Sequence, residues 1–340
     1  MNPTLYSCPR IFAYFITTNT FSLLKFTDIH LVLFLLVPRL FFGQFSPSES
    51  PNEGLTVHVL GTVQDAGSPH IACEKKCCAH LFETGDRSRK VVSLGIVDSK
   101  NNKTFLIEAT PDMPKQIRDL RLNAPFKEND YPDGVFLTHA HIGHYSGLMY
   151  LGKEAANTKN IPVYTMPKMH RFLRENGPWG QLVANNNIQL IQTENEKAIT
   201  VSEQLTVIPF TVPHRDEYSE TVGYKIIGPN KTLLFIPDID KWEKWDKDIK
   251  EEVKNVDYAL IDATFYDAEE INYRDISEIP HPFVIESMQL FQGLSISEKN
   301  KIHFIHFNHT NPLLNRDSEQ TRKVLEEGFQ IARKDMVFKL

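Results

Sequence analysis

The stretch that decides the fold reads Thr138-His139-Ala140-His141-Ile142-Gly143-His144, and the apolar residues 134–137 precede it. That apolar run predicts a buried strand that ends at the histidines. Alternate residues of an extended segment point to one side, so His139 and His141 face the same way, and a following turn brings in His144. Neutral imidazole is a good ligand for zinc and iron, and sites in α/β proteins lie at strand ends. The sequence therefore predicts a metal centre here.

Strands and helices alternate on both sides of this cluster. The predicted strands cover residues 56–60, 91–98, 104–109, 134–138, 161–165, 205–211, 222–227, 232–236, 258–261 and 301–307. The predicted helices cover residues 115–122, 147–156, 167–175, 241–256, 282–290 and 318–332. Many strands with helices distributed between them indicate an α/β fold in which helices cover the sheets.

Composition narrows the class of protein. The chain has 340 residues, of which 41% are apolar, so a sizeable core can be buried. The net charge of -6 argues against a general nucleic-acid binder, which usually carries a basic surface. It does not exclude an anionic substrate, because a bound metal supplies local positive charge. We expect a small-molecule substrate and no nucleic-acid partner.

The N-terminal residues differ from the rest. Residues 31–42 read LVLFLLVPRLFF, which is shorter than the roughly 20 apolar residues of a membrane span. The run suits a secretory signal, with Lys25 as a positive flank and Gly43 near a cleavage point. A later start near residue 22, an unstructured leader and an anchor helix are the alternatives. We predict a signal-like leader at 1–46, a linker at 47–54, and one domain at 55–340. The mature protein would then be exported or periplasmic without a membrane span, and cytoplasmic if the leader is not a signal.

At its histidine cluster the chain resembles the metallo-β-lactamase superfamily, which carries His-x-His-x-Asp-His after a buried strand. Gly143 stands where that family usually has aspartate. His214, Asp238 and His306 follow in the family's order, each after a predicted strand. The resemblance covers essentially everything after residue 55. It implies a four-layer αββα sandwich, in which helices flank two mixed β-sheets.

Four segments also resemble a subgroup of the family, the proteins similar to pyrroloquinoline quinone biosynthesis protein B. They are residues 60–69 (LGTVQDAGSP), the cysteine cluster that follows, residues 138–147, and residues 308–312 (NHTNP). This second resemblance keeps an iron-dependent oxidoreductase open as an alternative function.

The family resemblance implies two neighbouring ligand sets in the active site. The first is His139, His141 and His214, and the second is His144, His306 and a bridging Asp238. A metal bound there lowers the pKa of its water to about 7, which makes hydroxide available at neutral pH. Gly143 leaves the second set one carboxylate short, so we expect weak binding of a second ion and an active-site occupancy nearer one than two.

Further side chains are candidates for proton transfer or substrate contact beside Asp238. Asp262 follows a predicted strand, and His281 begins a predicted helix. A structural or solvated role is the alternative for both.

The cysteines form a second cluster. Cys73, Cys77 and Cys78 are an odd trio that cannot pair completely as disulfides, whereas Cys8 lies in the predicted leader. Thiolates are strong zinc ligands, so we predict a structural zinc site. One disulfide with a free thiol, or three buried thiols, are the alternatives. A resemblance to phosphodiesterases of the superfamily implies His309 as the fourth ligand, and His70 is the local alternative.

These observations favour a metal-dependent hydrolase that uses a metal-bound hydroxide on an ester-type bond, with a phosphodiester or a lactone as the candidate substrate. The expected cofactors are one or two zinc ions in the active site and one structural zinc ion, with iron as the alternative metal. A non-haem iron oxidoreductase related to quinone cofactor biosynthesis and a non-catalytic metal or ligand carrier are the alternative functions.

Overall fold

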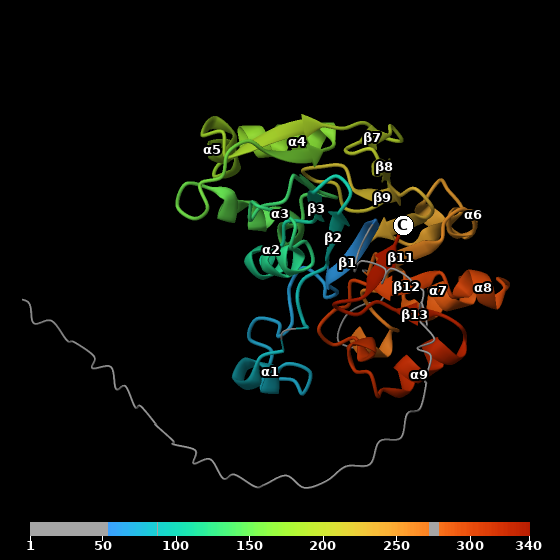
Figure 1. Ribbon diagram of the computed structural model, residues 1–340. Helices are drawn as coiled ribbons and strands as arrows, with labels where there is room; N and C mark the ends of the chain where they lie inside the picture. Colours follow the sequence, from blue (N-terminus) through green and yellow to red (C-terminus); the bar gives the residue numbers. More distant parts are fainter. Residues whose placement is uncertain (1–53, 87, 272–278) are drawn as a thin grey trace, which may run out of the picture. The chain divides into compact units, whose positions relative to one another are not determined.

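The computed structural model describes residues 54–86, 88–271 and 279–340 (Figure 1). The predicted leader, the linker up to residue 53, and Cys8 lie outside the described residues, so these assignments stay predictions. Among the helices of the described ranges, none is long and apolar enough to cross a membrane.

The first sheet has seven strands in the order β14-β1-β2-β3-β4-β5-β6. β14, β1, β2 and β3 pair antiparallel, and β3 to β6 pair parallel. The bounds are β1 Leu55–Gly61, β2 Ser93–Asp98, β3 Lys103–Ile107, β4 Gly134–Phe136, β5 Ile161–Thr165, β6 Ile188–Gln192 and β14 Val337–Lys339.

The second sheet repeats this layout with seven strands in the order β13-β12-β11-β10-β9-β8-β7. β7 to β10 pair antiparallel, and β10 to β13 pair parallel. The bounds are β7 Ile199–Thr200, β8 Thr206–Thr211, β9 Val222–Ile227, β10 Thr232–Ile236, β11 Tyr258–Asp262, β12 Ile302–Ile305 and β13 Gln330–Ile331. The chain therefore builds one mixed sheet after the other, and β14 returns to the first.

The helices lie between the strands along the chain. The α-helices are α1 Ala79–Thr84, α2 Met113–Leu122, α3 Ile142–Tyr145, α4 Pro167–Glu175, α5 Trp179–Ala184, α6 Ile249–Lys254, α7 Val284–Leu290, α8 Ile296–Lys299 and α9 Glu319–Glu326. The 3-10 helices are η1 Ser146–Leu151, η2 Trp242–Lys244, η3 Glu269–Ile271 and η5 Pro312–Leu314.

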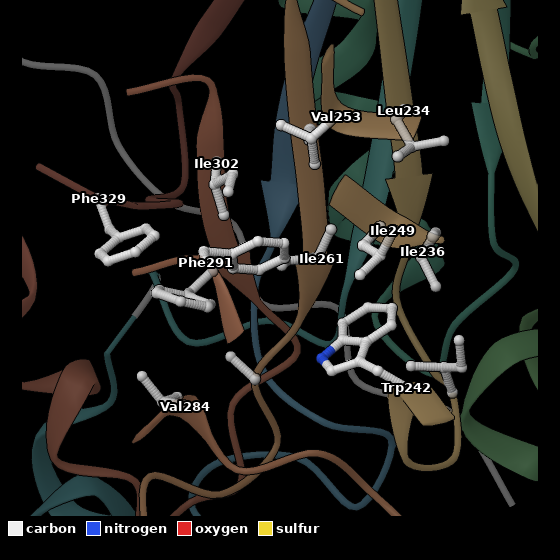
Figure 2. Close-up of a cluster of buried hydrophobic side chains, with 14 of the residues drawn as sticks. Leu234, Ile236, Trp242, Ile249, Val253, Ile261, Val284, Phe291, Ile302 and Phe329 are labelled. Atoms are coloured by element: carbon white, nitrogen blue, oxygen red, sulfur yellow. The ribbon is translucent and has the colours of Figure 1, made fainter. Parts of the chain in front are cut away.

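Three buried clusters define the layers. Successive residues of β10 point to opposite faces, so Leu233 and Phe235 enter the cluster between the sheets, while Leu234 and Ile236 face the helices. Figure 2 shows the helix-facing cluster, in which Trp242 of η2 and residues of α6 and α7 cover the second sheet. A third cluster packs α2, α4 and α5 on the first sheet. The predicted four-layer αββα sandwich is confirmed.

Some predicted elements differ from the structure. The helix predicted at 241–256 is divided into η2 and α6, because Trp245 turns extended and its buried indole donates to the carbonyl of Thr211. The helix predicted at 318–332 ends at Glu326, because Gly328 takes a left-handed φ of 91° and the chain continues into β13. The strands β6, β7, β13 and β14 were not predicted, because they are short or lack a clear apolar pattern.

Candidate metal centre

The first ligand set of the sequence prediction surrounds one carboxylate. Asp238 follows β10, and its Oδ1 lies 3.1 Å from Nε2 of His214. Its Oδ2 lies 3.4 Å from Nε2 of His139 and 3.8 Å from Nδ1 of His141. One ligand atom from each of these four residues lies within 4.8 Å of the other three. This spacing, with three imidazoles and a carboxylate, suits a zinc or iron ion.

Hydrogen bonds fix the imidazoles in the form that a metal needs. Nδ1 of His214 donates to Oδ1 of Asp240 at 3.1 Å, because a carboxylate can only accept, so Nε2 is the nitrogen left to face Asp238 and a metal. Nδ1 of His139 lies 2.8 Å from the hydroxyl of Thr138, and its buried Nε2 has no partner among the described residues. Ligating histidines typically have such partners on the far nitrogen.

The second predicted set lies on the other side of Asp238. Nε2 of His144 is 3.9 Å from Oδ2 of Asp238, so this carboxylate faces both sets. The hydroxyl of Thr264 donates to Asp262 and therefore accepts from Nδ1 of His306 at 2.8 Å, which frees Nε2 of His306. Within the described ranges, the completely buried Nε2 atoms of His144 and His306 have no hydrogen-bond partner. Buried polar atoms normally have partners, so both fit a bound cation.

Two acidic residues that the sequence did not single out join the second set. Asp65, in the loop after β1, offers an oxygen within 4.8 Å of the ligand atoms of His144 and His306. Glu108, which follows β3, places Oε2 3.6 Å from Nδ1 of His144. The prediction that this set is one carboxylate short considered only the histidine motif, whereas the structure brings the carboxylate of Asp65 close to His144 and His306. The sequence carries no local signal for either residue, because Asp65 lies five residues beyond the predicted strand 56–60 and Glu108 lies within the predicted strand 104–109.

Backbone strain accompanies the second set. Glu108 has a φ of 74° and His306 a φ of 70°, in the left-handed region that costs side chains other than glycine free energy. Both residues are completely buried beside His144. Strained residues that are held by their surroundings are concentrated at functional sites.

The two proton-transfer candidates contact each other. Nδ1 of His281, just before α7, lies 2.9 Å from Oδ2 of Asp262 and 3.2 Å from Oδ1 of Asp238. Asp262 is completely buried and also accepts from the backbone N–H groups of Ile239 and Thr264, so its carboxylate is held in place beside His281. The same three side chains are also close enough to share a cation.

Mutual attraction shifts the pKa values in this cluster. Burial alone would raise the pKa of Asp238, but His214 and His281 hold it well below its usual range. Burial would lower the pKa of His214, but Asp238 and Asp240 raise it to about 9. Burial alone would lower the pKa of His281 as well, but Asp262 and Asp238 raise it well above its usual value. The carboxylates thus create a site that favours positive charge.

A cleft of about 570 Å³ lies beside this cluster, with His281 in its lining. Its walls include Gln64, Arg215, Phe265, His281 and His309. Nη2 of Arg215 lies 3.1 Å from Nε2 of His141, at the border of the first ligand set. A larger groove of about 1060 Å³ lies between η2, α6 and α7, but its lining includes neither His281 nor Arg215. The smaller cleft is therefore the one that adjoins the candidate metal centre.

The predicted cysteine cluster also comes together. Nδ1 of His309 lies 3.5 Å from Sγ of Cys77 and 3.3 Å from Sγ of Cys78. Sγ of Cys73 is 4.0 Å from Sγ of Cys77, and the three thiols are free. The structure thus brings His309 to the trio, and the ring of His70 packs on His309 at a centroid distance of 4.5 Å.

The electrostatics of this cluster favour a cation. Burial and the neighbouring thiols of Cys78 and Cys73 raise the pKa of Cys77 to about 12. Burial, His70 and Lys75 lower the pKa of His309 to about 4, so its ring stays neutral and can act as a ligand. Three thiolates this close repel one another unless a metal ion lies between them, and a coordinating thiol is deprotonated outright. Three sulfurs and one nitrogen form a donor set of structural zinc sites.

Comparisons with known proteins agree with this geometry. Residues 103–306 match the family model described as "Beta-lactamase superfamily domain". The chain is 24% identical over 302 residues to coenzyme PQQ synthesis protein B of Acinetobacter baumannii (strain SDF), covering 81% of this chain and 97% of that protein. It is 26% identical over 308 residues to the Gluconobacter oxydans (strain 621H) protein of that name, covering 84% and 99%.

Solved structures show the same fold. Zn(2+)-bound PqqB from Methylobacterium extorquens matches with a TM-score of 0.67 and 22% identity, over 84% of this chain and 100% of that one. A diphosphatase from the PhnP family matches with a TM-score of 0.58 and 20% identity, over 85% and 98%. Since the family model spans more than half of the chain, this protein belongs to the metallo-β-lactamase superfamily and is similar to PqqB.

Proposed function

We propose that the chain is a metal-dependent hydrolase that cleaves an ester-type bond of an anionic small molecule, with a phosphodiester preferred to a lactone. The observation that carries the proposal is the double ligand set around Asp238, which contacts His281 in the lining of a cleft that also includes Arg215. Zinc-bound PqqB shares the fold, which supports zinc as the metal. The PhnP-family diphosphatase is a fold neighbour and no more than that.

The two ligand sets beside the cleft would have separate roles. His139, His141 and His214 would hold one ion, and Asp238 lies between them and His144. When bound, zinc supplies hydroxide at neutral pH and polarises the bond to be cleaved. The partners of the imidazoles, such as Asp240 for His214, orient the rings so that little reorganisation is needed.

Arg215 is suited to bind an anion. Nδ1 of His141 faces Asp238, so as a ligand it must be unprotonated, and a neutral ring then carries its proton on Nε2. A protonated Nε2 cannot accept from the guanidinium of Arg215, which now lies 3.1 Å away. Metal binding thus turns this contact into a repulsion between two donors. Arg215, whose side chain is 62% exposed and whose Nη1 lies 3.7 Å from the exposed carboxylate of Glu217, can then turn to a phosphate oxygen.

His281 is the proposed proton donor to the leaving group. Its Nδ1 donates to Asp262, which fixes the ring in the wall of the cleft. Nε2 is the ring atom that remains to hold and release a proton. A positioned acid of this kind typically contributes about 10²–10⁴-fold to a rate.

The test is turnover by the purified chain, with its metal content measured before any metal is added. Bis(p-nitrophenyl) phosphate and a panel of lactones serve as substrates. We expect zinc and phosphodiester turnover that His141→Ala abolishes, whereas His170→Ala, a change on α4 outside both ligand sets, has no effect. Iron with no hydrolysis would favour the oxidoreductase, and inactivity with every substrate and metal would favour the carrier.

A further inference from the structure

Gly143 lies so close to Asp65 that a side chain at position 143 would overlap with Asp65. Gly143 lies in α3, directly before the ligand His144. A Cβ built on Gly143 would lie 1.9 Å from Cβ of Asp65 and 2.4 Å from its Cα. The second of these neighbours is backbone, which cannot swing away. Glycine at 143 is therefore required by the course of the loop that carries Asp65.

That loop is held in place beside the second ligand set. The backbone N–H of Gln64 donates to the carbonyl of Phe307 at 2.8 Å, and the N–H of Phe307 donates to the carbonyl of Thr62 at 2.9 Å. Phe307 is the residue directly after His306. The segment around Asp65 thus runs beside the end of β12 and is fixed there by backbone hydrogen bonds. Its position does not depend on a flexible side chain.

The carboxylate of Asp65 meets unpartnered nitrogens. It lies within 4.8 Å of the ligand atoms of His144 and His306, whose side chains are completely buried. Among the residues that the structure describes, Nε2 of each of these rings has no hydrogen-bond partner. The side-chain amide of Gln64 donates to Oδ1 of Asp65 and so orients the carboxylate. Two imidazoles and a carboxylate thus direct buried lone pairs toward one point without hydrogen-bonding to one another. Such an arrangement suits the binding of a cation.

We propose that Asp65 is the carboxylate ligand of a second active-site metal ion, which it holds with His144, His306 and the shared Asp238. The ligand that the superfamily places within the histidine motif is supplied here by the loop after β1, and Gly143 makes room for it. We expected an active-site metal occupancy nearer one than two because only ligands at the family's motif positions were considered. The proposal requires that the chain binds metal, but it does not require that the chain is a hydrolase.

The test counts metal and does not use turnover. The full chain is equilibrated with buffered zinc, and bound metal per chain is measured for wild type, Asp65→Asn, Asp65→Ala and the control Asp216→Asn. Asp65→Asn has nearly the same size and shape, so its fold should be kept, and Asp216 is an exposed acid outside the ligand sets. We expect both Asp65 variants to lose one ion per chain at a zinc activity where wild type and Asp216→Asn keep it. Binding should weaken by more than about 100-fold, because even changes to partners of ligands cost about 10–100-fold.

Cobalt in place of zinc identifies which ion is lost. The cysteine site should keep its sulfur-to-cobalt charge-transfer absorption in the Asp65 variants, while an absorption from cobalt bound by nitrogen and oxygen ligands decreases. Gly143→Ala should cause the same loss, because its Cβ displaces Asp65 although alanine removes no ligand. Equal metal content and affinity in wild type and Asp65→Asn would overturn the proposal, whether or not the protein hydrolyses any ester.

Discussion

Oε2 of Glu108 lies 3.6 Å from Nδ1 of His144, and both side chains are completely buried. At this distance, longer than a hydrogen bond, the attraction of the carboxylate still favours the proton of His144 on Nδ1 and leaves Nε2 for a metal. We predict that Glu108→Gln weakens metal binding at the second ligand set by about 10–100-fold. Competition with a chromophoric chelator measures this affinity. An unchanged affinity in a variant with a native circular dichroism spectrum would exclude the orienting role.

His281→Gln tests the proposed proton donor. The change keeps a polar side chain but removes a group that can titrate, so kcat should fall by about 10²–10⁴-fold with little change in KM. Metal content should stay at the wild-type value, because His281 is not among the ligands we assign. Loss of an ion together with the activity would show that His281 is a ligand, as its proximity to Asp238 and Asp262 allows.

Arg215→Gln tests the choice of an anionic substrate. Removing the guanidinium should raise KM for a phosphodiester by about 10-fold, which corresponds to about 1.4 kcal/mol and is typical of one charge-assisted hydrogen bond. KM for a neutral lactone should not change. Arg174→Gln, an exposed arginine on α4, is the matched control. Equal effects on both substrates would remove the argument for an anion.

The cysteine cluster should contribute to stability. A site filled at about 100 times its Kd stabilises the folded state by about 2.7 kcal/mol, equivalent to roughly 4 °C in Tm for a chain of this size. We predict that Cys77→Ser loses one zinc ion and lowers Tm by that amount. The difference in Tm between the variant and the wild type should decrease when a strong chelator removes the metal from both proteins. A difference that persists in full would mean that packing of the thiol, and not zinc, is responsible.

Glu270 gives the stability a pH dependence. Burial raises its pKa to about 7 with a smaller contribution from Asp267, against hydrogen bonds from Thr310, Asn308 and the Tyr266 backbone. The folded state therefore binds a proton more tightly than the unfolded state, whose value is about 4.3, so stability falls as the pH rises from about 4.5 to 7. The decrease should be at most about 4 kcal/mol.

Glu270→Gln should remove that part of the pH dependence. Denaturant unfolding of the zinc-loaded protein at several pH values measures it, and Glu269→Gln is the exposed neighbouring control. Identical slopes for wild type and Glu270→Gln would contradict the assignment to this side chain.

Much of the centre could be predicted because its ligands follow strands with clear apolar patterns. His139 follows β4 of the first sheet, whereas His214, Asp238 and His306 follow β8, β10 and β12 of the second sheet. Asp65 and Glu108 could not be found in this way, because their roles depend on how β1 and β3 lie beside β4 and β12. No local pattern encodes that arrangement.

Interruptions of the helices were also invisible in the sequence. The pattern of residues 241–256 is compatible with one helix, and only the tertiary contact of Trp245 with Thr211 divides it. The two sheets have the same succession of antiparallel and parallel strand pairs. The sequence did not reveal this, because the two halves of the chain share the pairing pattern but no repeated amino-acid sequence.

The contact between Gly143 and Asp65 constrains how such a centre can change during evolution. Aspartate introduced at 143 would collide with the backbone of residue 65, and loss of Asp65 alone would leave the histidines without their acid. Relatives with glycine at the position of Gly143 should therefore carry an acid at the position of Asp65. Relatives with the motif aspartate should have a different path of the loop after β1. A search that demands the motif aspartate would misclassify chains of this kind as lacking the centre.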